Sequence, residues 1–202
     1  MHRQAARGIL VTLIVVGGCI AGSAAPGGAA PADIVRAGTI GSVNGDGVTL
    51  SSEGSGVTSV RIPPATRVLG RHPVGLDAIK PGDYLAVTSE RKADGTLVAV
   101  SINIFPPELK GRVREGQFPM DTGNIMTNAE VMEYAVRMEN QTLFLKYRDG
   151  ASAITVPPAT PVHRLTVIHL GDLRPGMHVI VRGVVNPDGS ITASSLTADR
   201  PG

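Results

Sequence analysis

The sequence predicts an all-β protein made of two tandem, small, five-stranded OB-like barrels with an irregular connector. Valine, isoleucine and threonine are frequent, whereas aromatic residues make up only 3% of the chain. With 25 glycines and 15 prolines, this composition is typical of many short strands joined by tight turns. Apolar residues make up 42% of the 202 residues, which is too many for a disordered chain. The third observation is an internal repeat.

The pentapeptide IPPAT at 62–66 returns as VPPAT at 156–160, a shift of 156 − 62 = 94 residues. With this shift residues 57–102 align without a gap, and 13 of the 46 aligned positions are identical. Solenoid repeats have periods of about 20–50 residues. The longer period therefore indicates two copies of a whole small domain.

Each copy contains five strand patterns separated by Asn-Gly, Asp-Gly and similar turn signals. A short helical turn is predicted between the third and fourth strand, at 76–79 and at 170–173. Five strands with an insertion at that point is the order of the OB-fold barrel. The predicted strands are 37–43, 48–52, 57–62, 83–90 and 96–104 in the first copy, and 128–138, 142–147, 151–156, 177–185 and 190–198 in the second.

The predicted domains are therefore a first barrel at 33–105, a connector at 106–127 and a second barrel at 128–199. Each barrel has roughly 70 to 75 residues, a size at which one core stabilises a fold only marginally. We therefore expect the two barrels to pack together.

The prolines of the repeated pentapeptide are predicted to end the third strand of each copy. Proline has no N–H for a strand ladder, and it holds the residue before it in extended geometry. The hydroxyls of Thr66 and Thr160 are expected to bind the turn that follows. This is a structural role, and the residues beside the two copies differ too much for a shared ligand loop.

Residues 1–32 are predicted to be an export signal. Arg3 and Arg7 precede a short apolar run at 9–16, which small residues follow. Two maturation routes are open: lipidation of Cys19 in the lipobox-like sequence VGGC, or cleavage after Ala24 or Ala32. Cys19 is the only cysteine, so no intramolecular disulfide can form. We expect an exported protein of the periplasm or cell envelope, held to the membrane only if Cys19 carries a lipid.

The charge of the exported chain argues against nucleic-acid binding. The whole chain has 19 basic and 17 acidic residues. Residues 1–32 hold two arginines and no acids, so 19 − 2 = 17 basic groups remain against 17 acidic ones. A binder of single strands needs a basic groove with stacking aromatics, and the sequence predicts neither.

The second half of each copy contains a Lys-Pro-Gly or Arg-Pro-Gly turn, a valine-rich strand, an Asp-Gly turn and an alanine-containing strand. In this order of features it resembles the bacterial envelope domains grouped as DUF5666. The connector is similar to that of exported two-domain proteobacterial proteins of unknown function, but has Gln-Phe-Pro-Met at 117–120 where histidine and tryptophan are expected. The resemblance implies a fold and an exported location, with no established activity.

No catalytic constellation stands out, and we predict no enzyme and no cofactor. The exported chain lacks a cysteine nucleophile, a Gly-x-Ser-x-Gly elbow and a phosphate loop. We predict an interaction or scaffold module whose ligand, an envelope protein or a small molecule, is unknown. The alternative is a copper or zinc protein that uses His163, His169 and His178, since imidazole binds both metals.

Four methionines recur every six residues at 120, 126, 132 and 138. Residues an even number of positions apart share one face of a strand. The spacing therefore predicts that Met132 and Met138 lie on a core face, with a methionine-lined metal site as the alternative.

Overall fold

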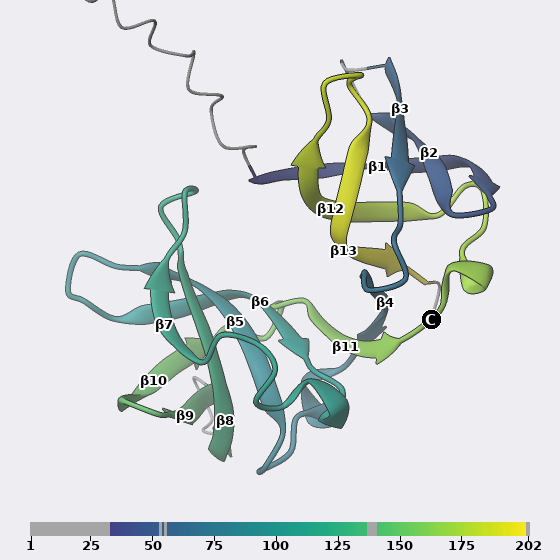
Figure 1. Cartoon of the computed structure of the whole chain (residues 1–202). Coiled ribbons are helices and arrows are strands. Elements are labelled where there is room, and N and C mark those ends of the chain that lie inside the picture. Colours follow the sequence, from purple (N-terminus) through teal and green to yellow (C-terminus); the bar gives the residue numbers. More distant parts are fainter. Residues whose placement is uncertain (1–32, 53, 55, 137–140, 201–202) are drawn as a thin grey trace, which may run out of the picture. The chain divides into compact units, whose positions relative to one another are not determined.

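A computed structural model describes residues 33–52, 54, 56–136 and 141–200 (Figure 1). These residues form thirteen strands and three short 3-10 helices. The strands are β1 (Asp33–Asn44), β2 (Gly47–Ser52), β3 (Gly56–Arg61), β4 (Arg67–Val74), β5 (Tyr84–Arg91), β6 (Leu97–Ile104), β7 (Gly116–Pro119), β8 (Ile125–Val136), β9 (Gln141–Tyr147), β10 (Gly150–Val156), β11 (Val162–Val167), β12 (His178–Val185) and β13 (Ile191–Asp199). The helices are η1 (Leu76–Ala78), η2 (Pro107–Leu109) and η3 (Leu170–Asp172). Among the described residues, no helix is long and apolar enough to cross a membrane.

The all-β class and the two repeats are confirmed. All ten predicted strands are present, and both predicted helical turns form, as η1 and η3. Three strands were not predicted: β4, its counterpart β11, and β7 in the connector. The export signal and Cys19 lie outside the described residues.

The strands pair into two closed rings. Ring A runs β1–β2–β3–β13–β12 and back to β1, and its β3–β13 pairing is parallel. Ring B runs β8–β9–β10–β6–β5 and back to β8, and its β10–β6 pairing is parallel. Both rings have the same order, and both leave few unpaired strand edges. The OB-like assignment of the two rings stays a prediction.

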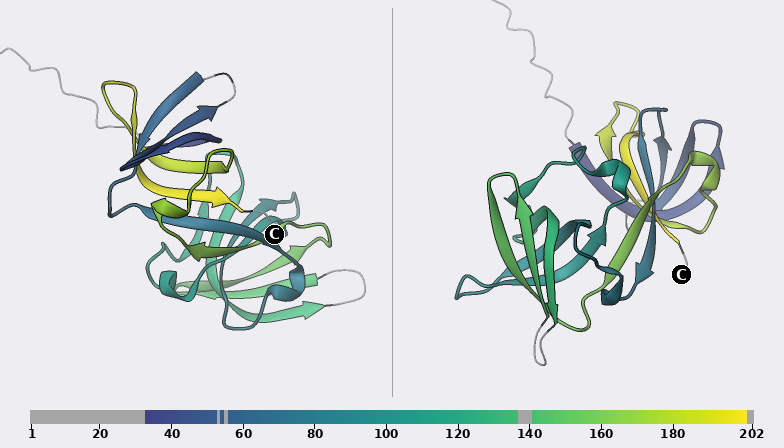
Figure 2. Two further views of the ribbon diagram at one scale, coloured as in Figure 1. Left: turned by 90° about the vertical axis from the view of Figure 1, so that its right-hand side faces the viewer. Right: turned by 90° about the horizontal axis from the view of Figure 1, so that it is seen from below.

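The repeats do not close rings of their own. Ring A combines the first three strands of the first repeat (β1–β3) with the last two of the second (β12 and β13). Ring B combines the first three strands of the second repeat (β8–β10) with the last two of the first (β5 and β6). Figures 1 and 2 show this as purple and blue strands beside yellow ones in ring A. The expected boundaries, 33–105 and 128–199, therefore delimit sequence repeats but not the rings. Equivalent strands have similar patterns, so the sequence cannot tell which copy supplies the last two strands.

The buried cores follow the rings. In ring A, Leu50 of the first repeat and Leu196 of the second are fully buried in one apolar cluster. In ring B, Leu85 and Leu143 share another cluster in the same way. Burying a large aliphatic side chain contributes about 1.5–3 kcal/mol, so each repeat stabilises the core of the other.

Two of the strands that were not predicted, β4 and β11, form the junction of this exchange. β4 pairs antiparallel with β11, in a register where Arg71 lies opposite Leu165. These two residues are equivalent in the repeat, since 165 − 71 = 94. The pairing is therefore symmetric about that position. We call β4 and β11 together the seam. From β4 the chain crosses through η1 to ring B, and from β11 it crosses through η3 to ring A.

The repeated pentapeptide forms the turn that leads into each seam strand. The Thr66 N–H donates to the Pro63 carbonyl at 2.8 Å, and the Thr160 N–H donates to the Pro157 carbonyl at 3.0 Å. The prediction for the threonine hydroxyls is wrong. The Thr66 hydroxyl donates to the Ala193 carbonyl on β13 at 2.9 Å, because the exchange brings that strand alongside. The buried Thr160 hydroxyl has no hydrogen-bond partner among the described residues.

The connector covers the seam and extends ring B. Phe105, Leu109 and Val113 pack with Leu69 of β4 and Leu165 of β11 in a third apolar cluster. Further along, β7 pairs antiparallel with the start of β8. The connector is therefore part of the packed structure.

The exchange predicts which core substitutions are energetically coupled. Leu50→Ala and Leu196→Ala should each lower the free energy of unfolding by about 2–5 kcal/mol. Their double mutant should depart from additivity by more than 0.5 kcal/mol, because the two side chains share the core of ring A. Urea unfolding measures these energies.

Ile102→Ala provides the matched control, since Ile102 is the repeat equivalent of Leu196 but lies in the core of ring B. The combination of Leu50→Ala with Ile102→Ala should be additive to within about 0.5 kcal/mol. Coupling between Leu50→Ala and Ile102→Ala, with additivity between Leu50→Ala and Leu196→Ala, would mean that each repeat closes its own ring.

Candidate functional site

His178 belongs to a charged cluster beside the seam. Its Nδ1 lies 3.0 Å from the Oδ2 of Asp199, and the other carboxylate oxygen accepts a hydrogen bond from Arg71 Nε at 2.5 Å. Burial tends to raise the pKa of Asp199, but the hydrogen bonds and positive charges of Arg71 and His178 outweigh it and lower that pKa. The carboxylate therefore joins a seam residue to ring A.

His163, on β11, is influenced by the same groups. Its Nδ1 is buried and has no hydrogen-bond partner among the described residues. Burial lowers the pKa of His163, the charge of Arg71 lowers it further, and Asp199 opposes both. The neutral imidazole is thus the favoured form, with one polar atom unsatisfied.

His169 serves a different purpose. It precedes η3, where its backbone N–H donates to the Asp172 carboxylate at 2.8 Å and the two residues form a capping box. The structure therefore does not gather the three candidate histidines into one site. Within the described part of the chain, no group of three His, Cys, Asp or Glu residues is placed to hold a metal ion.

The predicted methionine face is wrong for Met132. Its side chain is 57% exposed, because a β-bulge falls between Val131 and Glu133 and interrupts the alternation of faces. Met138 lies outside the described residues.

A hollow of about 570 Å³ lies at the seam. We call it the seam cavity. A second hollow of about 330 Å³ adjoins it and brings in both prolines of the first pentapeptide. The residues that line the seam cavity are Thr66, Arg67, Val68, Glu108, Leu109, Arg112, Val167, Ile168 and His169.

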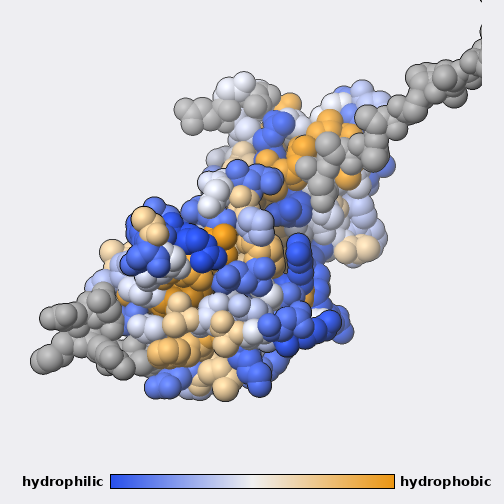
Figure 3. All heavy atoms as spheres, turned by 90° about the vertical axis from the view of Figure 1, so that its left-hand side faces the viewer, coloured by the Kyte–Doolittle hydropathy of each residue, from blue (hydrophilic) through white to orange (hydrophobic). Residues whose placement is uncertain are grey.

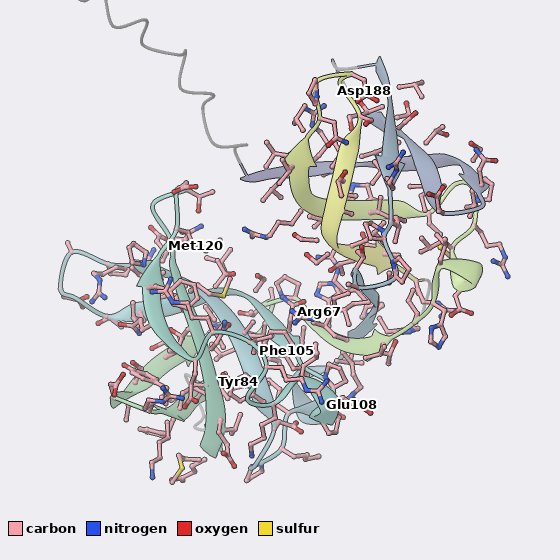
Figure 4. The ribbon with its side chains drawn as sticks, in the orientation of Figure 1. Arg67, Tyr84, Phe105, Glu108, Met120 and Asp188 are labelled. Carbon is pink, nitrogen blue, oxygen red and sulfur yellow. The ribbon has the colours of Figure 1, made fainter. Side chains whose placement is uncertain are left out.

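The seam cavity combines an apolar wall with charged groups. Val68 and Ile168 belong to the core of ring A, and Val167 is 51% exposed. Arg67 comes from β4, whereas Glu108 and Arg112 come from the connector, and all three line the cavity. Arg67 and Glu108 are labelled in Figure 4. Within the described residues, none of these three charges forms an ion pair within 4.0 Å. Such a cavity suits a ligand with an apolar body and an anionic group.

The sequence did not reveal this cavity. The repeat equivalent of Arg67 is Pro161, and Arg112 lies in the connector, which has no repeat equivalent. The two side chains line one cavity because the connector packs against β4 and β11. The preference of the pentapeptide for a turn was visible, but not the cavity beside it.

A smaller polar hollow of about 250 Å³ lies at the hairpin ends of ring A, beside Arg61 and Asp188. The Asp188 carboxylate accepts hydrogen bonds from the N–H and hydroxyl of Ser190, which lower its pKa. In ring B, the backbone N–H of Thr96 donates to the Asp94 carboxylate in the same way, and this bond lowers the pKa of Asp94. These acidic groups therefore stabilise turns, and we do not assign them a ligand.

The exchanged strand rings define the class: an all-β tandem-repeat protein. Within that class, the family model described as "Domain of unknown function (DUF5666)" matches residues 37–103 and 127–197. The chain belongs to the DUF5666 family. No curated protein and no solved structure matches it.

Stability should fall in mild acid because of His163. A pKa lowered below the ordinary 6.5 means that protonation favours the unfolded chain. The stabilisation is therefore complete above about pH 6.5 and is lost as the pH falls toward the folded-state pKa. Urea midpoints measured between pH 7.5 and 5 should decline less steeply for His163→Gln than for the wild type. An unchanged slope in His163→Gln would contradict this account.

Proposed function

We propose that this protein is a non-enzymatic interaction or scaffold module of the cell envelope, with the seam cavity as its ligand site. The observation that supports the proposal is the pair of arginines, Arg67 and Arg112, unpaired with carboxylates among the described residues, beside an apolar wall. A charge left without a partner in a concave site is a candidate for ligand binding. The ligand is amphipathic, with an anionic group held by the arginines.

Export is part of this proposal. The basic start, apolar run and small residues of 1–32 support it. Mass spectrometry of the protein recovered from an envelope fraction should find a chain that begins at Cys19 with a lipid, or after Ala24 or Ala32. An intact Met1 start in a cytoplasmic fraction would contradict export.

An amphipathic anionic dye is a suitable first probe. Anilinonaphthalene sulfonate carries an aromatic body and one sulfonate, so the native protein should bind it in the seam cavity and enhance its fluorescence. Replacing both arginines, Arg67→Gln with Arg112→Gln, should weaken binding by at least about tenfold, since each hydrogen bond to a charged group contributes about 1.5–3 kcal/mol.

Arg148→Gln is the matched control, since Arg148 lies beside a different hollow and its loss should leave binding unchanged. Circular dichroism verifies that each variant is folded, because partly unfolded proteins also bind this dye. Equal binding by the wild type and the double variant would refute the seam cavity as the site.

Metal binding is the second candidate function. One observation favours it: the Nδ1 of His178 lies 3.0 Å from the Asp199 carboxylate, and imidazole with carboxylate suits zinc or copper(II). His169 is not part of this arrangement and should be dispensable.

Calorimetric titration of the exported protein with Cu(I), Cu(II) and Zn(II) tests this candidate. Binding tighter than about micromolar that is lost in His178→Ala and kept in His169→Ala would support it. Absence of binding at that level would remove it.

A further inference from the structure

β1 and β8 are equivalent strands that differ in what lies beside them. β12 pairs with β1 so that His178 faces Thr39, and β5 pairs with β8 so that Tyr84 faces Glu130. His178 and Tyr84 are repeat equivalents, so Glu130 corresponds to Thr39, an offset of 130 − 39 = 91. The bulges at Gly41 and Met132 differ by the same 91 residues.

In ring B, β7 covers part of the edge of β8. It pairs antiparallel with residues 125–128. At an offset of 91, the corresponding residues of β1 are 34–37. Residues 34–37 pair with β12 on one side. Among the described strands, none pairs with them on the other side. On that side the Ser52 hydroxyl donates a hydrogen bond to the Ala37 carbonyl at 2.7 Å. We call residues 34–37 of β1 the open edge.

The contacts of β7 indicate which side chains such an edge accepts. Phe118 lies opposite Met126, and the Arg114 guanidinium lies 4.3 Å from the centre of the Phe118 ring. Beside it, Gln117 donates to the hydroxyls of Thr127 and Ser152 at 3.2 and 3.1 Å. An added strand thus presents one aromatic and one hydrogen-bonding residue.

The open edge has the same plan with different chemistry. Val35 occupies the position of Met126, and it is 58% exposed, one of the two most exposed large apolar side chains described. The face drawn in Figure 3 is mostly blue and white, with smaller orange patches of apolar residues. Arg36 replaces Thr127, and Thr58 replaces Ser152. Arg36 forms no ion pair with a described carboxylate. A residue opposite Arg36 would therefore be favoured if it carried a carboxylate.

We propose that the open edge binds an extended segment of a partner protein by β-strand addition. The partner strand carries a large apolar residue opposite Val35 and a glutamate or aspartate opposite Arg36. Main-chain hydrogen bonds supply affinity and alternate side chains supply selectivity, as in other strand-addition complexes. This surface is separate from the seam cavity, so failure of one proposal leaves the other standing.

A peptide based on β7 tests the proposal. The probe is the segment 114–121 with Gln117→Glu, of sequence REGEFPMD, and the comparison peptide has lysine at that position. Added to the exported protein, the glutamate peptide should shift the amide signals of residues 34–37 in NMR spectra. It should bind roughly threefold more tightly than the lysine peptide, as expected for an exposed ion pair.

Two variants sharpen the test. Arg36→Glu should reverse the preference between the two peptides, which a merely destabilised protein would not do. Val100→Lys, at an exposed apolar residue on β6 of ring B, should bind like the wild type.

Three results would overturn the proposal. The peptides could leave residues 34–37 unperturbed at millimolar concentration. The amides of this stretch that point away from β12 could be protected from hydrogen exchange in the free monomer, which would mean that the chain covers its own edge. The protein could dimerise through this stretch, which would make a second copy the occupant.

Discussion

The antiparallel pairing of β4 with β11 is the constraint on which the rest of the structure depends. Each seam strand leaves one ring and leads to the other, so their pairing fixes the positions at which the chain crosses. The register centred on Arg71 and Leu165 treats both repeats alike. Each seam strand also pairs with a ring strand on its other side: β4 pairs with β13 of ring A, and β11 pairs with β6 of ring B. The seam therefore joins the two rings into one hydrogen-bonded system.

The candidate sites follow from the same exchange. The seam cavity exists because residues beside β4, β11 and the connector come together, and Asp199 reaches Arg71 because β13 of one repeat lies beside β4 of the other. The open edge arises from a difference between the copies: a strand of the connector precedes β8, and no described strand takes its place beside β1. Duplication produced two similar rings, and the connector made their surfaces different.

The sequence predicted much of the fold from local patterns. Val, Ile and Thr alternation with Asp-Gly turns located ten strands, and the prolines at 63–64 marked a turn correctly. β4 was not predicted because Gly70 and Pro73 interrupt its strand pattern, and it becomes a strand through its partners. The exchange itself could not be predicted, since equivalent strands of the two repeats have similar apolar patterns and could fill the same core. The seam cavity was missed for the same reason, because its arginines come from segments that only the seam brings together.

Cleavage of the connector tests the exchange most directly. A protease site placed in the exposed turn around Gly111 would divide the chain into its two repeats without cutting a ring strand. Because each ring contains strands from both halves, the halves should stay together as one folded complex after dilution. An isotope-labelled half should enter the complex only when urea unfolds it. Separation into two species, each folded with the mass of one repeat, would contradict the account.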